Sequence, residues 1–78
     1  MPDPYIGEIR MLTGRYAPQG WGLCDGQERN IRDYQGLFNL IGTAHGGDGK
    51  TTFALPKLEP YQGVNFYISF YGAQPSPA

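Results

Sequence analysis

Glycine and proline limit what this chain can fold into, because they divide its 78 residues into short segments. Twelve glycines and seven prolines are spread along the whole chain and are not gathered in one linker. Glycine permits the positive φ angles of tight turns, and proline fixes φ and removes a backbone donor. This distribution is typical of short strands joined by tight turns, and the length predicts one small domain over residues 1–78.

Alternating side chains predict strands near both ends of the chain. In residues 5–12, Ile9 and Met11 share one face of the expected strand. Residues 64–71 show the clearest alternation: Val64, Phe66, Ile68 and Phe70 lie on one face, and Asn65, Tyr67, Ser69 and Tyr71 on the other. Residues 72–78 follow as a small, proline-rich tail, which we expect to be extended or disordered.

Three shorter segments complete the expected sheet. Residues 21–24 follow a proline and glycine turn at residues 17–20 and are predicted to be a strand. Asp25-Gly26 is a tight-turn signal, so residues 27–29 are expected to pair with the preceding strand. Residues 51–55 are expected to be extended and to end at a proline.

The segment from Asn30 to Gly42 predicts a helix of about three turns. Asn30 is a candidate cap at its start, and Gly42 suits a left-handed stop at its end. One apolar stripe runs along it, formed by Tyr34, Leu37, Phe38 and Ile41. A helix this short is not stable alone, so it is expected to lie on the strands. The fold class is therefore α+β, with one amphipathic helix on a short, mostly antiparallel sheet.

The matched periodicities of the strands and the helix predict the core. Twelve side chains are expected to be mostly buried: Ile9, Met11, Trp21, Leu23, Leu37, Phe38, Ile41, Phe53, Leu55, Phe66, Ile68 and Phe70.

Composition excludes several classes of function. Cys24 is the only cysteine and His45 the only histidine, so the chain has neither an internal disulfide nor a clustered metal site. A scattered net charge of −1 argues against nucleic acid, and no apolar run is long enough for membrane insertion. So small a domain needs additional stabilisation, and oligomerisation is the remaining source. The first residues lack the features of a secretory signal, so we expect release by lysis or by a dedicated machine.

Candidate catalytic groups do not form a convincing site. Gly49-Lys50-Thr51 resembles part of a phosphate-binding loop, but a helix precedes it and an extended segment follows, the reverse of what phosphate binding needs. Asp25 is expected to bond its own turn rather than to pair with Asp33. Cys24 is expected to behave as a small buried hydrophobic residue. We therefore expect no catalytic residue, no cofactor and no metal.

The tyrosines of the last strand suggest a contact between subunits. Tyr67 and Tyr71 lie opposite its fully apolar face, and a strand with two such faces is seldom half-exposed in a monomer. Tyrosine is also common in interfaces. The alternative is packing within the chain, with the helix covering one face and the N-terminal segment the other. We expect Tyr5, Tyr67, Tyr71 and Pro75 to contact a neighbouring subunit.

The order of motifs from Gly7 to Leu58 resembles a known family. A Pro-x-Gly-Trp turn leads to Leu-Cys-Asp-Gly, a helix ends on glycine, and a Gly-Gly-Asp-Gly turn leads to Thr-Thr-Phe-x-Leu-Pro. This order resembles the tail collar domain of phage short tail fibres and of the microcystin-dependent proteins. The resemblance places the collar region at residues 5–58 and implies a structural, adhesive protein rather than an enzyme. It also implies that the tryptophan at position 21 lies inside the fold.

The chain departs from longer family members after Leu55-Pro56. Those members continue with Asp-Leu-Arg-Gly-Arg and a distal insertion that reads the receptor, whereas this chain proceeds to residues 64–71, which resemble the closing strand of the microcystin-dependent proteins. Some short tail fibres hold a metal through histidines, but those ligands belong to the distal region, so His45 does not inherit that role. The resemblance thus implies a collar domain without its distal half.

Two functions follow as hypotheses. The first is a self-assembling structural subunit of an extracellular filament, a virion or a phage-tail-like particle, which would be a homo-oligomer. The alternative is a trimeric adhesin tip that recognises a cell-surface glycan, with His45 and Tyr61 as candidate ligand contacts.

Overall fold

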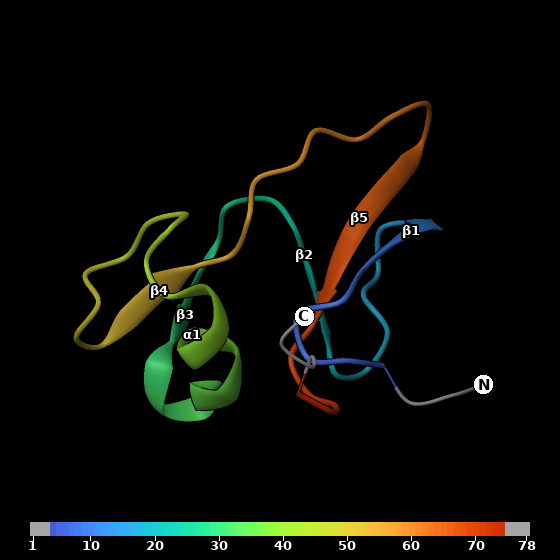
Figure 1. Cartoon of the computed structure of the whole chain (residues 1–78). Helices are drawn as coiled ribbons and strands as arrows, with labels where there is room; N and C mark the ends of the chain where they lie inside the picture. Colours follow the sequence, from blue (N-terminus) through green and yellow to red (C-terminus); the bar gives the residue numbers. More distant parts are fainter. Residues whose placement is uncertain (1–3, 75–78) are drawn as a thin grey trace.

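The computed structural model describes residues 4–74, which form five short strands, one 3-10 turn and one α-helix (Figure 1). The elements are β1 (Ile9–Thr13), β2 (Trp21–Leu23), β3 (Glu28–Asn30), η1 (Ile31–Asp33), α1 (Gln35–Ile41), β4 (Thr52–Ala54) and β5 (Val64–Ser69). The predicted α+β class with a mostly antiparallel sheet is confirmed.

The strands form two antiparallel sheets at opposite ends of the molecule. β5 lies between β1 and β2 in a three-stranded sheet, and β3 pairs with β4 in a second sheet (Figure 1). The prediction that residues 27–29 pair with the preceding strand is wrong. The backbone N–H of Gly26 donates to Pro56 and that of Leu55 donates to Gln27. The chain after β2 therefore runs beside the segment that contains β4 and does not fold back on β2.

The helix begins later than its apolar stripe predicts. Asn30 pairs with Thr52 in the second sheet, and the N–H of Ile31 donates to the carbonyl of Thr51. The backbone of Asn30 therefore stays extended, and its side chain caps nothing among the described residues. Tyr34, at φ −136° and ψ 47°, separates the 3-10 turn from α1. Gly42 ends the helix at the predicted position with a positive φ of 56°, but its ψ of −141° is not that of the left-handed helical stop expected from the sequence.

The core lies where α1 and the two sheets meet. It contains Ile6, Cys24, Leu37, Phe53, Leu55, Ile68 and Phe70, all buried. Gly22 makes this junction feasible, because a Cβ there would lie 2.4 Å from Cζ of Phe70 and 3.0 Å from Cδ1 of Leu55. The absence of a side chain at Gly22 lets these two core residues approach β2 closely.

The predicted core is only partly correct. Its members Leu37, Phe53, Leu55, Ile68 and Phe70 are buried, as expected. Five others are half-buried: Trp21, Leu23, Phe38, Ile41 and Phe66. The prediction is wrong for Ile9 and Met11, whose side chains are 43% and 62% exposed.

The length of the helix explains why Ile9 and Met11 are exposed. α1 has seven residues and is therefore about 10 Å long, whereas six residues of β5 extend about 20 Å. Leu37 of the helix shares the core with Ile68 of β5, whereas Met11, which pairs with Phe66 further along β5, lies outside that core. Figure 1 shows β5 and β1 projecting away from α1.

Tyr67 packs within the chain and is 0% exposed. Its hydroxyl donates to the carbonyl of Gly14 at 2.8 Å, and the amide of Asn65 donates to the same carbonyl at 2.7 Å. The segment after β1 therefore covers this side of β5. Tyr67 therefore packs internally, which is the alternative that the sequence left open. Its side chain offers no surface to a neighbouring subunit.

The glycine-rich loop between α1 and β4 is organised by one carboxylate. Oδ1 of Asp48 accepts the backbone N–H groups of Lys50, Thr51 and Thr52 at 2.8–2.9 Å. Oδ2 of Asp48 also accepts the hydroxyl of Thr51 at 3.0 Å. The N–H bonds, that of Thr52 foremost, hold the pKa of Asp48 well below its usual range. The loop thus supplies its own anion to the donors that a bound phosphate would need.

The first testable prediction compares two leucines of α1. Leu37 is 0% exposed and Leu40 is 46% exposed. Leu37→Ala should lower the free energy of unfolding by about 3 kcal/mol, because it leaves a cavity in the core, whereas Leu40→Ala should cost less than about 1 kcal/mol. Urea denaturation of dilute protein measures both. Equal losses would show that the helix face is assigned wrongly.

The second prediction concerns Asp48 and pH. Because folding lowers the pKa of Asp48, its ionised form stabilises the fold fully above the ordinary aspartate pKa of about 4, and that stabilisation is lost as the pH falls further. Asp48→Asn should therefore lower Tm at pH 7, and the difference from the native chain should shrink below about pH 4. A Tm difference that stays constant from pH 7 to pH 3 would contradict this role.

Candidate subunit interface

One face of the three-stranded sheet carries apolar side chains that the chain leaves uncovered. In the β1–β5 register, Ile9 lies opposite Ile68 and Met11 lies opposite Phe66. Directly opposed residues of antiparallel strands project to the same face. Only Ile68 of these four is buried, because it belongs to the core that also contains Leu37 and Phe53.

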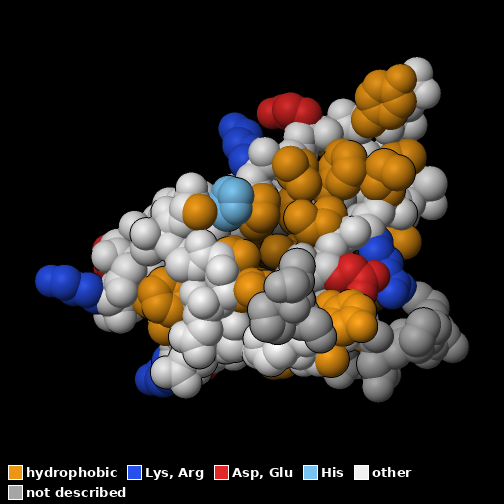
Figure 2. All heavy atoms as spheres, in the orientation of Figure 1, with side chains coloured by type: hydrophobic (Ala, Val, Ile, Leu, Met, Phe, Trp, Pro, Cys, Tyr) orange, Lys and Arg blue, Asp and Glu red, His pale blue; other side chains and the backbone are white. Residues whose placement is uncertain are grey.

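Neighbouring segments extend this apolar surface at both ends. Tyr61 is bridged to Val64 by two backbone hydrogen bonds of 2.9 Å, which place its side chain on the same face. Leu40 of α1 packs against the start of β1, since a Cβ on Gly7 would lie 2.6 Å from its Cδ2. We call this surface the apolar sheet face, formed by Ile9, Met11, Leu40, Tyr61, Val64 and Phe66. Figure 2 shows hydrophobic side chains gathered over this part of the molecule, with the histidine at their edge.

The opposite face of the sheet is closed by polar contacts. The guanidinium of Arg10 lies over the Trp21 ring, 5.2 Å from its centroid, and also pairs with the carboxylate of Glu8. The hydrogen bond from Arg10, followed by the backbone N–H of Tyr5, lowers the pKa of Glu8. Together with the buried Tyr67, these groups leave the two faces chemically different: one satisfied by its own chain, the other apolar and open.

β1 also presents a free edge. Within the described part of the chain, β1 is hydrogen-bonded to β5 alone and lies at the outside of its sheet. Alternate backbone N–H and C=O groups of an edge strand point away from the sheet and are available to another strand. The free edge therefore adjoins the apolar sheet face at Ile9 and Met11.

The interface residues expected from the sequence fall in different places. Tyr5 and Tyr71 are exposed, at 56% and 57%, near the two ends of the described chain, where Tyr5 bridges to Ala73. Pro75 lies outside the described residues. Side-chain periodicity alone places Ile9 and Met11 in the core and does not reveal the apolar sheet face. The signal that could have revealed it is that one short helix has too little apolar surface to cover a whole sheet.

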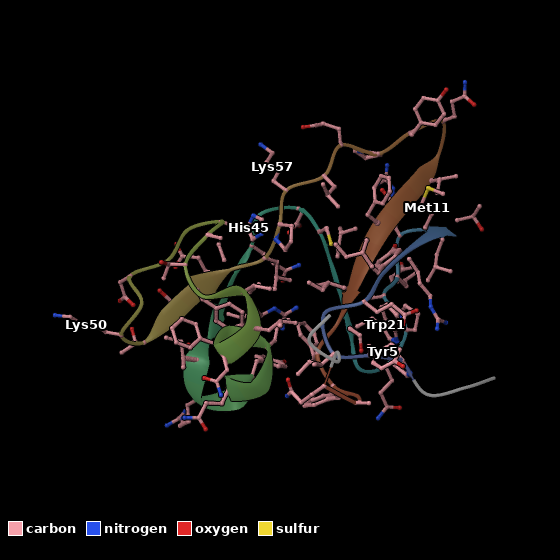
Figure 3. All side chains as sticks on the ribbon, in the orientation of Figure 1. Tyr5, Met11, Trp21, His45, Lys50 and Lys57 are labelled. Carbon is pink, nitrogen blue, oxygen red and sulfur yellow. The ribbon has the colours of Figure 1, made fainter. Side chains whose placement is uncertain are left out.

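The candidate glycan contacts lie apart on the chain. His45 is exposed in the loop after α1, and Tyr61 is exposed before β5. Within residues 4–74, no hydrogen bond or ring contact joins them. Figure 3 shows His45 near the second sheet, away from the projecting ends of β1 and β5.

The surroundings of Cys24, Asp25 and Asp33 indicate structural roles for these side chains. Burial, reinforced by the charge of Asp25, raises the pKa of the Cys24 thiol to about 11. Asp25 accepts the backbone N–H of Gln27, as expected for a turn. Asp33 lies instead 3.7 Å from the exposed side chain of Arg32.

No three metal-binding side chains gather anywhere in residues 4–74. Among the elements described here, no helix has the length and apolar character needed to cross a membrane.

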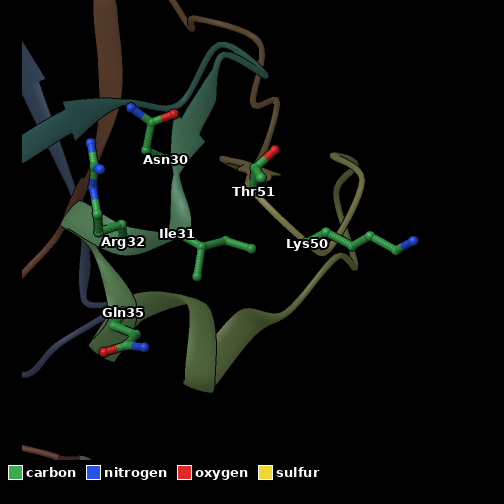
Figure 4. Close-up of a pocket in the computed structure, with 6 residues that line it drawn as sticks. All are labelled: Asn30, Ile31, Arg32, Gln35, Lys50 and Thr51. Carbon is green, nitrogen blue, oxygen red and sulfur yellow. The ribbon is translucent and has the colours of Figure 1, made fainter.

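An open hollow of about 500 Å³ lies between η1 and the glycine-rich loop (Figure 4). Its lining includes Asn30, Ile31, Gln35 and Thr51, with Arg32 and Lys50 on the rim. Figure 4 shows the side chains of Arg32 and Lys50 extending away from each other and from the hollow. Two diverging cations do not converge on one anion, so this hollow is a weaker candidate than the apolar sheet face.

The comparison with family models agrees with these features. The model of the phage tail collar domain matches residues 7–61, which include both sheets except for β5. Among curated proteins and among solved structures, none matches this chain. The match covers more than half of the chain, and the collar domain is a structural domain of phage tail fibres. The chain therefore belongs to the phage tail collar domain family.

Proposed function

We propose that this chain is a self-assembling structural subunit of a phage tail fibre or tail-like particle, and that its copies associate through the apolar sheet face. The observation that carries the proposal is the exposure of Met11 and Ile9 on the edge strand of a hydrophobic sheet face. Contiguous apolar patches of this kind are uncommon on monomers and mark interaction sites.

A second copy is the partner that best fits this surface. Its side chains on β1 and β5 are uncharged, so a charged partner would gain nothing there. Two copies of the same face would remove each other's apolar groups from water, at about 25 cal/mol per Å² buried. Fibres built from collar domains are typically homo-oligomers. Such mutual burial also supplies the stabilisation that a 78-residue domain lacks on its own.

The alternative function is a trimeric tip that binds a glycan. Ligand sites combine apolar and aromatic surface with a few convergent polar groups, and within residues 4–74 no hydrogen bond or ring contact joins His45 to Tyr61. The two functions differ in assembly, because a tip closes as a ring whereas a filament grows through contacts that do not close. Electron microscopy of the purified protein, together with a glycan-binding assay, separates them.

The third prediction tests the apolar sheet face. Met11→Glu places a carboxylate within the proposed contact, where burial would leave it unpaired. We expect sedimentation velocity to show smaller species than the native chain forms at the same concentration. The Tm at low protein concentration should stay unchanged, because Met11 is 62% exposed in the single chain.

Tyr16→Glu is the matched control for charge. Tyr16 is 94% exposed and lies outside the apolar sheet face, so this variant should assemble as the native chain does. If Met11→Glu also assembles like the native chain, copies do not meet through this face. If Tyr16→Glu dissociates as completely as Met11→Glu, added negative charge alone explains the effect.

A further inference from the structure

A second surface, distinct from the apolar sheet face, lies where the two ends of the described chain meet. It is a hollow of about 420 Å³, a size typical of ligand and peptide sites. Trp21 and Tyr71 supply aromatic surface to it, and Pro4, Gly20 and Gly72 supply much of the rest. We call it the terminal groove.

The fold holds the terminal groove open through close backbone contacts. Tyr71 lies beside Gly20, where a Cβ would be 3.8 Å from its ring. Gly72 has a φ of 135°, and a Cβ there would lie 2.1 Å from the carbonyl oxygen of Pro4. Any other residue at Gly72 would push the two chain ends apart. Trp21 is held from the other side by the guanidinium of Arg10.

The chemistry of the groove suits a proline-rich strand. Two aromatic rings provide flat apolar surfaces, and proline-rich segments dock in aromatic-lined grooves because their extended helix is already formed. Among residues 4–74, no acceptor bonds the indole N–H of Trp21, and the hydroxyl of Tyr71 makes no hydrogen bond. Both donors are thus available to the backbone carbonyls of a bound segment, which polyproline II conformation leaves unpaired.

We propose that the terminal groove binds the segment Gln74-Pro75-Ser76-Pro77 of a second copy of this chain. The segment has the composition that the groove selects, and it leaves the molecule at Ala73, on the rim of that groove. Each copy therefore carries the groove and its ligand side by side. The proposal rests on the proposed function only in that copies assemble; it uses different residues from the apolar sheet face.

The neighbouring copy, and not the same chain, supplies the segment. Tyr71, Gly72 and Ala73 line the groove themselves, so a segment that follows them directly would need a tight turn to bind there. A turn over residues 72–75 or 74–77 would end on a proline, which has no N–H to close it. A turn over residues 73–76 would place Pro75 at a disfavoured position. Ala73 is also held in place by hydrogen bonds to Pro4 and Ile6.

Such a contact joins two different surfaces and therefore repeats. A groove on one copy takes the segment of the next, whose own groove remains free, so the chain of contacts stays open unless its rotation closes a ring. A contact between two apolar sheet faces uses the same surface on both copies and ends there. The two contacts together give a fibre whose length comes from repetition.

Trp21 is the only tryptophan of the chain, so its fluorescence reports directly on the groove. The test uses the full chain with Pro75→Gly and Pro77→Gly, which keeps the groove and weakens the segment. Titration with a peptide of residues 74–78 should shift the Trp21 emission saturably. In this background, Tyr71→Ala should lower the affinity for the peptide by about tenfold, as expected for loss of one aromatic contact. A peptide with both prolines replaced by glycine, and the Tyr61→Ala variant, are the matched controls.

Mixing two variants distinguishes a neighbouring copy from the same chain. Both carry Met11→Glu, so that the apolar sheet face does not contribute. One adds Tyr71→Ala and keeps its segment; the other adds Pro75→Gly and Pro77→Gly and keeps its groove. We expect neither to assemble alone and the mixture to form a 1:1 pair by sedimentation.

The outcomes separate the two contacts. A 1:1 pair in this background supports the groove contact even if the sheet-face contact proves wrong. No pair and no response to the peptide overturns the groove proposal and leaves the sheet-face proposal untouched. In the Met11→Glu chain, a Trp21 shift on replacing both prolines that does not depend on protein concentration would mean that the segment binds its own groove, which also overturns the proposal.

Discussion

The short α1 helix cannot cover the whole length of β5, and the surface chemistry of the molecule follows from that mismatch. Seven helical residues span about 10 Å and six strand residues about 20 Å, so the core buries Ile68 and Phe70, leaves Phe66 half-buried at its edge and leaves Met11 exposed. The radius of gyration, 12.3 Å, slightly exceeds the roughly 11.5 Å expected for a compact chain of this length, in agreement with a projecting sheet end. A monomer would keep this apolar surface in water, whereas an assembly removes it.

The two candidate contact surfaces differ in the interactions by which each would bind another copy. The apolar sheet face lacks charged side chains on β1 and β5, so its association would depend on area buried and would change little with salt. The terminal groove offers aromatic rings together with donors, so it favours a ligand with carbonyls and proline rings. The sheet-face contact joins the same surface on both copies and would form pairs. The groove contact joins two different surfaces and would extend a fibre.

Backbone hydrogen bonds explain where local sequence patterns mislead. The pattern of Asn30 and the apolar stripe predicts one continuous helix, but Asn30 pairs with Thr52, its side chain makes no capping hydrogen bond, and Tyr34 separates the 3-10 turn that follows from α1. Asp25-Gly26 predicts a hairpin, yet the Gly26 N–H donates to Pro56. In both cases the competing partner lies some twenty or more residues away, where periodicity carries no information.

The sequence by itself determined the α+β class, the helix end at Gly42, the turn chemistry of Asp25, the buried Leu37, Phe53, Leu55, Ile68 and Phe70, and the family. These depend on local backbone preference and on side-chain periodicity, both of which are written in neighbouring residues. Only the tertiary structure decided that Tyr67 is internal and that Met11 is exposed, because periodicity identifies the two faces of a strand but does not say which elements are long enough to cover them. The terminal groove likewise exists only because Tyr5 meets Ala73 across nearly the whole chain.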